Sequence, residues 1–304
     1  MFDKSKIEEL NKIATAMVAP GKGILAADES LGTIEKRFSK INLPNTEENR
    51  QAYREMLFTT KGIGDYISGV IMFDETIRQK TRSGVPFVEV LTNAGPIPGI
   101  KVDQGTEETL GSPNEKITKG LDGLPERLKG YVRFGARFAK WRAVITIGDG
   151  IPTDENISEN NRRLAKYAKM CQEAGLMPMV EPEVLMDGSH SMERCEEVSL
   201  KTLESLFVEL AKEGVALEGM ILKTNMVLPA KDSGQKATPE QIAEMTLRLF
   251  KKVLPNELPG EAFLSGGQSE TGATENLNAI NQTGPFPWKL TFSYGRALQD
   301  SALK

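Results

Sequence analysis

The stretch MPMVEPEV, residues Met177–Val184, is a short apolar run between two longer amphipathic segments. The segment before it, residues 158–174, ends at Gly175, and the segment after it, residues 191–213, ends at Gly214. A glycine in this place is a common C-terminal cap of a helix. A short apolar strand between two helices is the repeating unit of an α/β protein with a parallel sheet.

The same unit recurs along the chain. Eight apolar runs are predicted strands, at residues 23–28, 67–73, 99–103, 138–145, 177–184, 219–225, 262–266 and 290–294. Eight strand–helix units in one series favour a single domain over residues 1–304 with the TIM (β/α)8-barrel fold, although an open Rossmann-like sheet with extra strands also fits. The polar, glycine-rich residues 104–123 are interpreted as a long surface excursion, which either covers the site or has no role, before a helix near 125–134.

Composition narrows the class of partner. The 304 residues are 39% hydrophobic and 26% charged, which is ordinary for a folded protein. A net charge of −4 argues against nucleic acid and favours a small phosphorylated ligand held by a few Lys or Arg side chains. Residues 1–16 lack the apolar core of a signal peptide, and no segment is long enough to span a membrane. Cys171 and Cys195 lie in helix-like runs, so we expect a cytoplasmic protein without disulfides.

Ionisable side chains gather at or near the C-terminal ends of the predicted strands, where TIM-barrel enzymes build their active sites. Structural ion pairs are an alternative explanation for each one alone. Their coincidence indicates a catalytic centre. The residues are Asp28, Lys101, Lys140, Arg142, Glu181, Glu183, Lys223 and Arg296.

Two pairs of these charges are expected to face the same space. Glu181 and Glu183 are two residues apart on one strand, so their backbones are about 7 Å apart on a shared face. Either one carboxyl holds a proton or a cation lies between them. Lys140 and Arg142 share a face in the same way and need anions, which are these glutamates, a substrate phosphate or both.

Lys223 follows the apolar residues 219–222, which predicts a buried amine close to other cations. Both conditions favour the neutral, nucleophilic form of a lysine. From these residues alone, a structural lysine paired with Glu181 or Glu183 is an equally good interpretation.

The last two predicted strands end in the glycine-containing segments 264–267 and 293–296, where barrels usually bind phosphate. The chain has one histidine, His190, which we predict in a surface loop. A zinc site built from two or three histidines is therefore excluded.

These motifs closely resemble those of class I fructose-1,6-bisphosphate aldolases of the animal and plant type, in the same order and over nearly the whole chain. They are residues 19–30, 99–103, 138–142, 180–183, 222–223, 263–270 and 292–298. The resemblance implies reversible cleavage of fructose 1,6-bisphosphate to dihydroxyacetone phosphate and glyceraldehyde 3-phosphate, in glycolysis and gluconeogenesis, through a lysine Schiff base. It also implies a cytoplasmic homotetramer that uses no metal and no cofactor.

The resemblance assigns a role to each site residue. Lys223 attacks the ketose carbonyl, Glu181 is the main proton-transfer group and Glu183 assists it. Asp28 takes the proton of the C4 hydroxyl, and Lys140 stabilises charge during cleavage. The residues implied for the phosphate of the dihydroxyacetone half are Ser265, Gly266, Gly295 and Arg296, those for the distal phosphate are Ser30, Thr33, Lys101 and Arg142, and Ser293 is a further substrate-binding residue.

Three departures from the family pattern stand out. Thr33 occupies a place where the family often has serine, and Thr224 replaces the proline that commonly follows the imine lysine. Only residues 297–304 follow Arg296, whereas animal and plant members continue into another helix and a mobile tail, so the resemblance is to a short form without that tail.

Two alternatives stay open. The first is an aldolase for fructose 1-phosphate or sedoheptulose 1,7-bisphosphate, although Lys101 and Arg142 favour a substrate with a second phosphate. The second is a non-catalytic barrel with a binding role, which the intact set of acid, base and lysine argues against.

Overall fold

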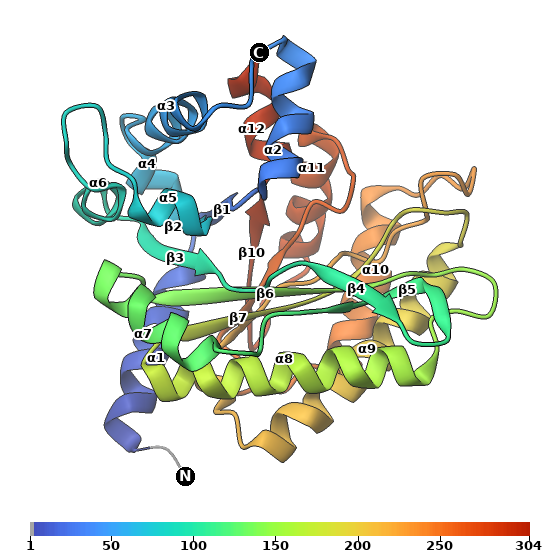
Figure 1. Ribbon diagram of the computed structural model, residues 1–304. Helices are drawn as coiled ribbons and strands as arrows, with labels where there is room; N and C mark the ends of the chain where they lie inside the picture. The colour runs from blue at the N-terminus through green and yellow to red at the C-terminus, as the bar shows by residue number, and fades with distance from the viewer. Residues whose placement is uncertain (1–2) are drawn as a thin grey trace.

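The computed structural model describes residues 3–304 and shows a closed barrel surrounded by helices (Figure 1). Its eight parallel strands are neighbours in the order β1-β10-β9-β8-β7-β6-β3-β2. The predicted TIM (β/α)8 barrel is confirmed, and the alternative of an open sheet is wrong. The strands are β1 (Gly23–Ala27), β2 (Ile67–Met72), β3 (Ile97–Lys101), β6 (Phe138–Ile145), β7 (Met177–Val184), β8 (Ile221–Leu222), β9 (Gly260–Phe263) and β10 (Lys289–Tyr294).

Helices connect the strands and cover the outside of the barrel. The two longest, α8 and α9, end at Gly175 and Gly214 with φ of +80° and +69°, as the glycine caps predict. The short α12 follows the last strand. The helices are α1 (Lys4–Met17), α2 (Leu31–Phe38), α3 (Glu47–Phe58), α4 (Ile63–Tyr66), α5 (Asp74–Arg78), α6 (Phe87–Ala94), α7 (Leu124–Phe134), α8 (Asp154–Ala174), α9 (Met192–Glu213), α10 (Pro239–Val253), α11 (Glu270–Gln282) and α12 (Arg296–Leu303).

Side chains of β6 alternate between the barrel interior and the helix layer, as predicted for 138–145. Phe138 belongs to the apolar cluster inside the barrel. Trp141 faces outward and packs on Tyr167 of α8, with ring centroids 5.5 Å apart. Lys140 and Arg142 are two and four residues after Phe138, so they lie on the same face of the strand and point into the barrel.

Helix α1 covers the N-terminal end of the barrel. Its residues Leu10, Ala14 and Met17 are buried and form one apolar cluster with barrel-lining residues such as Phe138. The space for a ligand is therefore at the opposite end, where the strands have their C-termini.

β8 is shorter than the predicted strand at 219–225. Residues Leu217–Gly219 form a 3-10 helix, and only Ile221 and Leu222 are in strand conformation. The N–H of Thr224 donates to the side chain of Glu261 at 2.7 Å instead of to a carbonyl of a neighbouring strand. Lys223 keeps its backbone hydrogen bond to the carbonyl of Val180 on β7, so the ladder becomes irregular at Thr224, on the side of β9.

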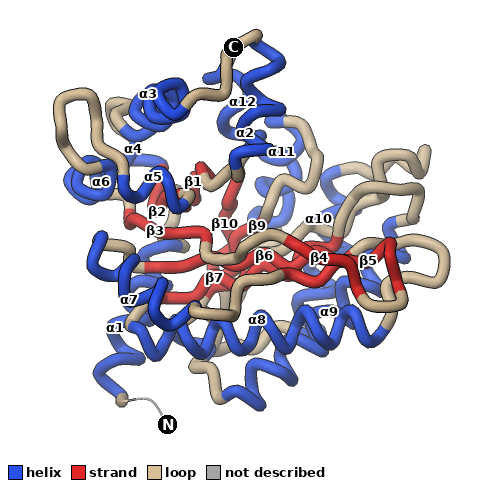
Figure 2. Tube along the Cα trace, viewed as in Figure 1, coloured by secondary structure: helices blue, strands red, loops and turns tan. Residues whose placement is uncertain are grey.

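Residues 104–123, interpreted from the sequence as a long surface excursion, contain regular structure. They contain an antiparallel hairpin of β4 (Thr106–Thr109) and β5 (Ser112–Thr118), which lies in front of the barrel strands in Figure 2. The hairpin is polar, so hydrophobic periodicity does not reveal it. Side chains of α8 hold it in place: Asn160 donates to the carbonyl of Lys116 and accepts the N–H of Thr118.

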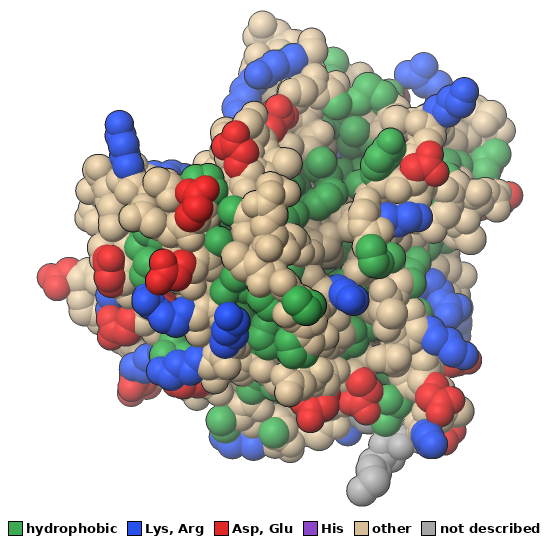
Figure 3. Space-filling view, turned by 180° about the vertical axis from the view of Figure 1, so that it is seen from behind, with side chains coloured by type: hydrophobic (Ala, Val, Ile, Leu, Met, Phe, Trp, Pro, Cys, Tyr) green, Lys and Arg blue, Asp and Glu red, His purple; other side chains and the backbone are tan. Residues whose placement is uncertain are grey.

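Charged side chains of both signs are interspersed on the face shown in Figure 3. No helix within residues 3–304 is both long and apolar enough to cross a membrane. Cys171 and Cys195 lie in α8 and α9 as unpaired, buried thiols.

Candidate active site

A cavity of about 1350 Å3 opens at the C-terminal ends of the strands. Every residue that the sequence singles out for catalysis or substrate binding lines it. They are Asp28, Ser30, Thr33, Lys101, Lys140, Arg142, Glu181, Glu183, Lys223, Ser265, Gly266, Ser293, Gly295 and Arg296.

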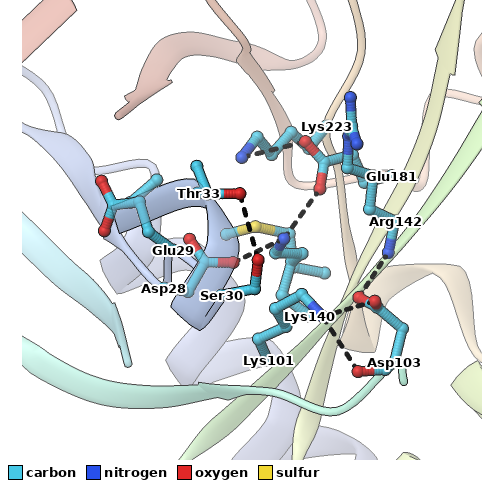
Figure 4. Close-up of polar contacts among 12 residues, drawn as sticks. Asp28, Glu29, Ser30, Thr33, Lys101, Asp103, Lys140, Arg142, Glu181 and Lys223 are labelled. Carbon is cyan, nitrogen blue, oxygen red and sulfur yellow. Dashed lines mark hydrogen bonds and ion pairs between the residues drawn. The ribbon is translucent and has the colours of Figure 1, made fainter. Parts of the chain in front are cut away.

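A chain of three ion pairs crosses the cavity floor (Figure 4). Lys223 Nζ lies 3.0 Å from Glu181 Oε1, and Lys140 Nζ lies 3.2 Å from Glu181 Oε2. Lys140 Nζ also lies 2.6 Å from Asp28 Oδ2. All four side chains are nearly inaccessible to solvent, the most exposed being that of Asp28 at 11%. The amine of Lys223, the carboxylate of Glu181 and the ammonium of Lys140 are thus in direct contact in a site that solvent does not reach.

The pKa values of these groups follow from burial and from each other. Burial alone would raise the pKa of Asp28, but the charges of Lys140 and Lys223 outweigh it and lower the pKa to about 2. The pKa of Glu181 is lowered for the same reason, since Lys140, Lys223 and Arg142 surround a buried carboxyl. Burial works against the charge of Lys140, yet Asp28 and Glu181 raise its pKa well above the ordinary value. Asp28, Glu181 and Lys140 are therefore charged near neutral pH.

The sequence left two alternatives for the glutamate pair, a protonated carboxyl or a cation between the carboxylates. The structure shows the second. Glu181 contacts two lysines, and Glu183 is paired with Arg142 Nε. The pKa of Arg142 is raised because Glu183 outweighs the effect of burial. The prediction that Lys140 and Arg142 need anions on their face is confirmed.

The sequence did not single out Asp103, which organises the basic residues on one side of the cavity. Its Oδ1 lies 2.5 Å from Lys101 Nζ, and its Oδ2 accepts the N–H of Arg142 at 3.3 Å. Asp103 is two residues beyond Lys101 in the predicted strand 99–103, and this spacing is a signal that could have found it.

Glu29 was also missed. It is buried and paired with Arg37 at 2.8 Å and Arg54 at 2.6 Å, and both Glu29 and Arg37 line the cavity. Arg54 belongs to the polar helix α3 and is buried, which no local pattern indicates.

The ends of β9 and β10, where the sequence predicts a phosphate region, line the cavity. Gly266 and Gly267 both have positive φ, +51° and +82°, which only glycine adopts readily. Gly295 is the residue before α12, whose first residue is Arg296. The Ser293 hydroxyl is buried and has no hydrogen-bond partner within the described part of the chain. A free hydroxyl, glycine backbone and a guanidinium suit a phosphate.

Ser30 and Thr33 lie at the start of α2. Their hydroxyls are 3.0 Å apart, and Ser30 makes no side-chain cap to the helix. Both hydroxyls line the cavity and are thus available to a polar ligand.

The prediction for His190 is wrong. The residue lies in the segment between β7 and α9, but it is only 9% exposed because its segment packs against residue Ala230, whose N–H donates to the His190 carbonyl. Burial, with a contribution from Arg194, lowers its pKa. Residues 3–304 contain no group of three or more His, Cys, Asp or Glu arranged to hold a metal ion.

A buried lysine in contact with a carboxylate, at the mouth of a TIM barrel with basic regions on both sides, is typical of the class of barrel enzymes that act on phosphorylated substrates with a lysine nucleophile. Comparison with known proteins identifies the family. The model of the class I fructose-bisphosphate aldolases matches residues 9–304. The chain therefore belongs to the class I fructose-bisphosphate aldolase family.

The relatives match over nearly the whole length of this chain. The probable fructose-bisphosphate aldolase class 1 of Xanthomonas axonopodis pv. citri is 56% identical over 298 residues, 98% of this chain and 89% of that protein. The cytosolic fructose-bisphosphate aldolase 4 of Arabidopsis thaliana is 56% identical over 97% of this chain and 76% of its own. The aldolase of Plasmodium falciparum, solved in complex with TRAP and a small-molecule inhibitor, superposes with a TM-score of 0.98 at 52% identity, covering 99% of this chain and 88% of that chain. The activity of the family is aldol cleavage of fructose 1,6-bisphosphate in glycolysis, and the chain is a lyase of this kind.

Proposed function

We propose that Lys223 forms the imine with the ketose carbonyl and that Glu181 transfers the protons of this step, assisted by Glu183. The observation that carries the proposal is the 3.0 Å contact between Lys223 Nζ and Glu181 Oε1, in a place where both side chains are at most 5% exposed. An ammonium must lose a proton before it can attack a carbonyl, and Glu181 is close enough to accept it. Glu181 can then return a proton to the departing water.

For the cleavage step, Asp28 accepts the proton of the C4 hydroxyl. The C3–C4 bond breaks, its electron pair moves to the iminium nitrogen to give an enamine, and glyceraldehyde 3-phosphate leaves as the aldehyde. With a pKa of about 2, Asp28 is a weak base as long as Lys140 contacts it. The substrate hydroxyl must therefore take over the contact with Asp28, which frees Lys140 to stabilise negative charge on the reacting oxygen.

The barrel order supports a substrate with a phosphate at each end. β9 and β10, which carry Ser265, Gly266, Ser293, Gly295 and Arg296 at their ends, lie across the barrel from β3 and β6, which carry Lys101 and Arg142. A bisphosphate can span the mouth between these two sides and keep its carbonyl over Lys223. Ser30 and Thr33 on α2 add hydroxyls for the distal phosphate.

The proposal is tested by borohydride reduction in the presence of dihydroxyacetone phosphate and EDTA, followed by peptide mass mapping. We expect one triose phosphate adduct, on Lys223, and none in Lys223→Met. Lys140 is the matched control, since it is an equally buried lysine of the same cavity. An adduct on Lys140, or a folded protein with no adduct, contradicts the proposal.

We further propose that the enzyme is a cytoplasmic homotetramer of one domain spanning residues 1–304. The cytosolic relative of Arabidopsis thaliana supports the compartment. The closed barrel, which uses strands from Gly23 to Tyr294, supports the single domain. Light scattering on the purified protein tests the assembly, with an expected mass of four times the 33.4 kDa chain.

A further inference from the structure

Glu261 is a buried carboxyl that none of the steps above uses. It is the second residue of β9 and is 0% exposed. The next residue, Ala262, belongs to the apolar cluster inside the barrel, and Phe263 stacks on Phe250 of α10 outside it. Strand alternation therefore places Glu261 on the outer side with Phe263, between the barrel and the helix layer.

From this position Glu261 contacts the backbone next to the reactive lysine. Its Oε1 accepts the N–H of Thr224 at 2.7 Å, so it holds the peptide group that joins Lys223 to Thr224. The other side of the same segment is held by β7, because the N–H of Lys223 donates to the carbonyl of Val180 at 2.9 Å. The Lys223 backbone is thus fixed from two directions at the point where β8 ends.

The contact is needed because Thr224 is itself buried, at 3% exposed. A residue with an N–H at this place requires an acceptor, since water does not reach it and an unpaired buried donor is unfavourable. Glu261 supplies that acceptor, and its second oxygen, Oε2, has no hydrogen-bond partner within residues 3–304. The hydrogen bond from the Thr224 N–H thus explains why a carboxyl is found at this solvent-inaccessible position.

We propose that Glu261 is a positioning residue, which orients the Lys223 amine for imine formation by holding the Lys223–Thr224 peptide from behind the barrel wall. This rests on the proposed role of Lys223. Glu261 touches no substrate, and the substrate-binding groups lie on the inner side of the wall, so its loss affects the formation of the imine and not the capture of the phosphates.

The charged groups that act on Glu261 are Lys223 on the β8 side and Glu181 on β7. Burial raises the pKa of Glu261 to about 8, against the opposing effects of the Thr224 hydrogen bond and Lys223. Near neutral pH the carboxyl is protonated and resembles the amide of glutamine. Above pH 8 it becomes a carboxylate, and the added negative charge near Lys223 slows the attack of the amine.

The test measures the rate of borohydride trapping with dihydroxyacetone phosphate, together with kcat and KM for fructose 1,6-bisphosphate, in four variants. Glu261→Met keeps the length of the side chain but removes the acceptor, and we expect trapping and kcat to fall about tenfold with KM unchanged, because a lost hydrogen bond of this kind corresponds to a factor of that order. Glu261→Gln keeps an acceptor and is expected to trap at the wild-type rate at pH 7. In Thr224→Pro combined with Glu261→Met the N–H is also gone, and we expect most of the rate to return.

Glu115→Met is the matched control. Glu115 is also 0% exposed and accepts the N–H of Thr153 at 2.8 Å, but it does not line the cavity. We expect it to lower the thermal midpoint and leave trapping unchanged. If Glu115→Met slows trapping as much as Glu261→Met does, the effect is a general loss of stability and the proposal is wrong.

If Glu261→Met does not fold, the pH dependence of trapping in the wild type and in Glu261→Gln tests the proposal. We expect the ratio of the wild-type rate to the Glu261→Gln rate to fall as pH rises from 7 to 9, and a flat ratio overturns the proposal. Wild-type trapping separates the two levels of inference. No adduct on Lys223 in the wild type overturns the proposed function and this inference with it, whereas a normal adduct with an unchanged rate in Glu261→Met overturns this inference alone.

Discussion

Lys140 compensates the negative charge at the cavity floor, because its ammonium contacts both Asp28 and Glu181. Burial would raise the pKa of both carboxyls, and Lys140 is the largest of the influences that lower them. Without this cation Asp28 would lose its ion pair, and Glu181 would keep its ion pair with Lys223.

We predict that Lys140→Met lowers kcat for fructose 1,6-bisphosphate by at least about a hundredfold, since it removes a fixed charge from the reacting centre. It also changes the pH dependence of stability. The folded pKa of Asp28, about 2, is below an unfolded value near 3.9, so the group adds stability that is complete above about pH 5 and is lost as pH falls towards 2. The shift corresponds to roughly 2–3 kcal/mol.

The difference in thermal midpoint between wild type and Lys140→Met should therefore be largest near pH 7 and shrink towards pH 3. Lys129→Met removes an exposed lysine that pairs with Glu126 and serves as the control. A constant difference over this pH range would show that Lys140 does not stabilise the ionised form of Asp28.

Glu261 has the opposite pH dependence. Its folded pKa, about 8, is above the unfolded value near 4.3, so the folded state binds a proton that the unfolded state releases. Stability falls as pH rises through this interval, by at most about 1.4 kcal/mol per pH unit, and the loss is complete above pH 8. We predict that the thermal midpoint of Glu261→Gln lacks this decline, so that the variant gains on the wild type between pH 5 and pH 8. Parallel midpoint curves would contradict the raised pKa.

At the scale of elements, strand parity and helix caps could be predicted because they depend on neighbours in the sequence. The alternation in β6 follows from adjacent residues, and Gly175 and Gly214 end their helices locally. The charges at the strand ends also come together at one cavity, as barrel geometry predicts.

The features that could not be predicted from the sequence depend on distant partners. The hairpin of β4 and β5 is held by Asn160 of α8, some 40 residues further along the chain. The N–H of Thr224 after β8 is bound by the side chain of Glu261, 37 residues further along the chain. His190 is buried because residues around Ala230 pack on its segment. None of these contacts has a periodic or compositional signal.

Helix α1 contributes to stability at the N-terminal end of the barrel, whereas the candidate active site lies at the C-terminal end. Leu10 of α1 is 1% exposed and packs into the cluster at the N-terminal end, opposite the cavity. We predict that Leu10→Ala lowers the free energy of unfolding by about 2–5 kcal/mol, as expected for a large-to-small change in a packed core, and leaves kcat and KM unchanged. Chemical denaturation and steady-state kinetics measure the two effects. Val208→Ala on α9, at a side chain that is 54% exposed, is the control and should change neither. A lower kcat in Leu10→Ala would mean that the ends are coupled.

The charge of the whole molecule differs from the charge of its cavity. The chain has a formal net charge of −4, whereas basic side chains outnumber acidic ones on the cavity wall. The basic residues are Lys36, Arg37, Lys40, Arg78, Lys101, Arg127, Lys140, Arg142, Lys223 and Arg296, and the acidic ones are Asp28, Glu29, Asp74, Asp103, Glu126, Glu181 and Glu183. A small polyanion is therefore drawn to the mouth while the rest of the surface repels it, and we expect its association to weaken as salt is added.

Because the two basic sides of the mouth lie across the barrel from each other, the preference for a bisphosphate should depend on the side that carries Arg142. We predict that Arg142→Gln lowers kcat/KM for fructose 1,6-bisphosphate by about ten- to a hundredfold, the range expected for a lost charge-assisted bond to phosphate, and leaves kcat/KM for fructose 1-phosphate nearly unchanged. Arg248→Gln removes an exposed arginine that is paired with Glu196 away from the cavity, and both substrates should react with it as with the wild type. Steady-state kinetics on the two substrates gives the ratio directly. Equal losses on both substrates would mean that Arg142 acts in the reaction steps that they share. If the wild type shows no preference for the bisphosphate, the proposed binding of a second phosphate is wrong.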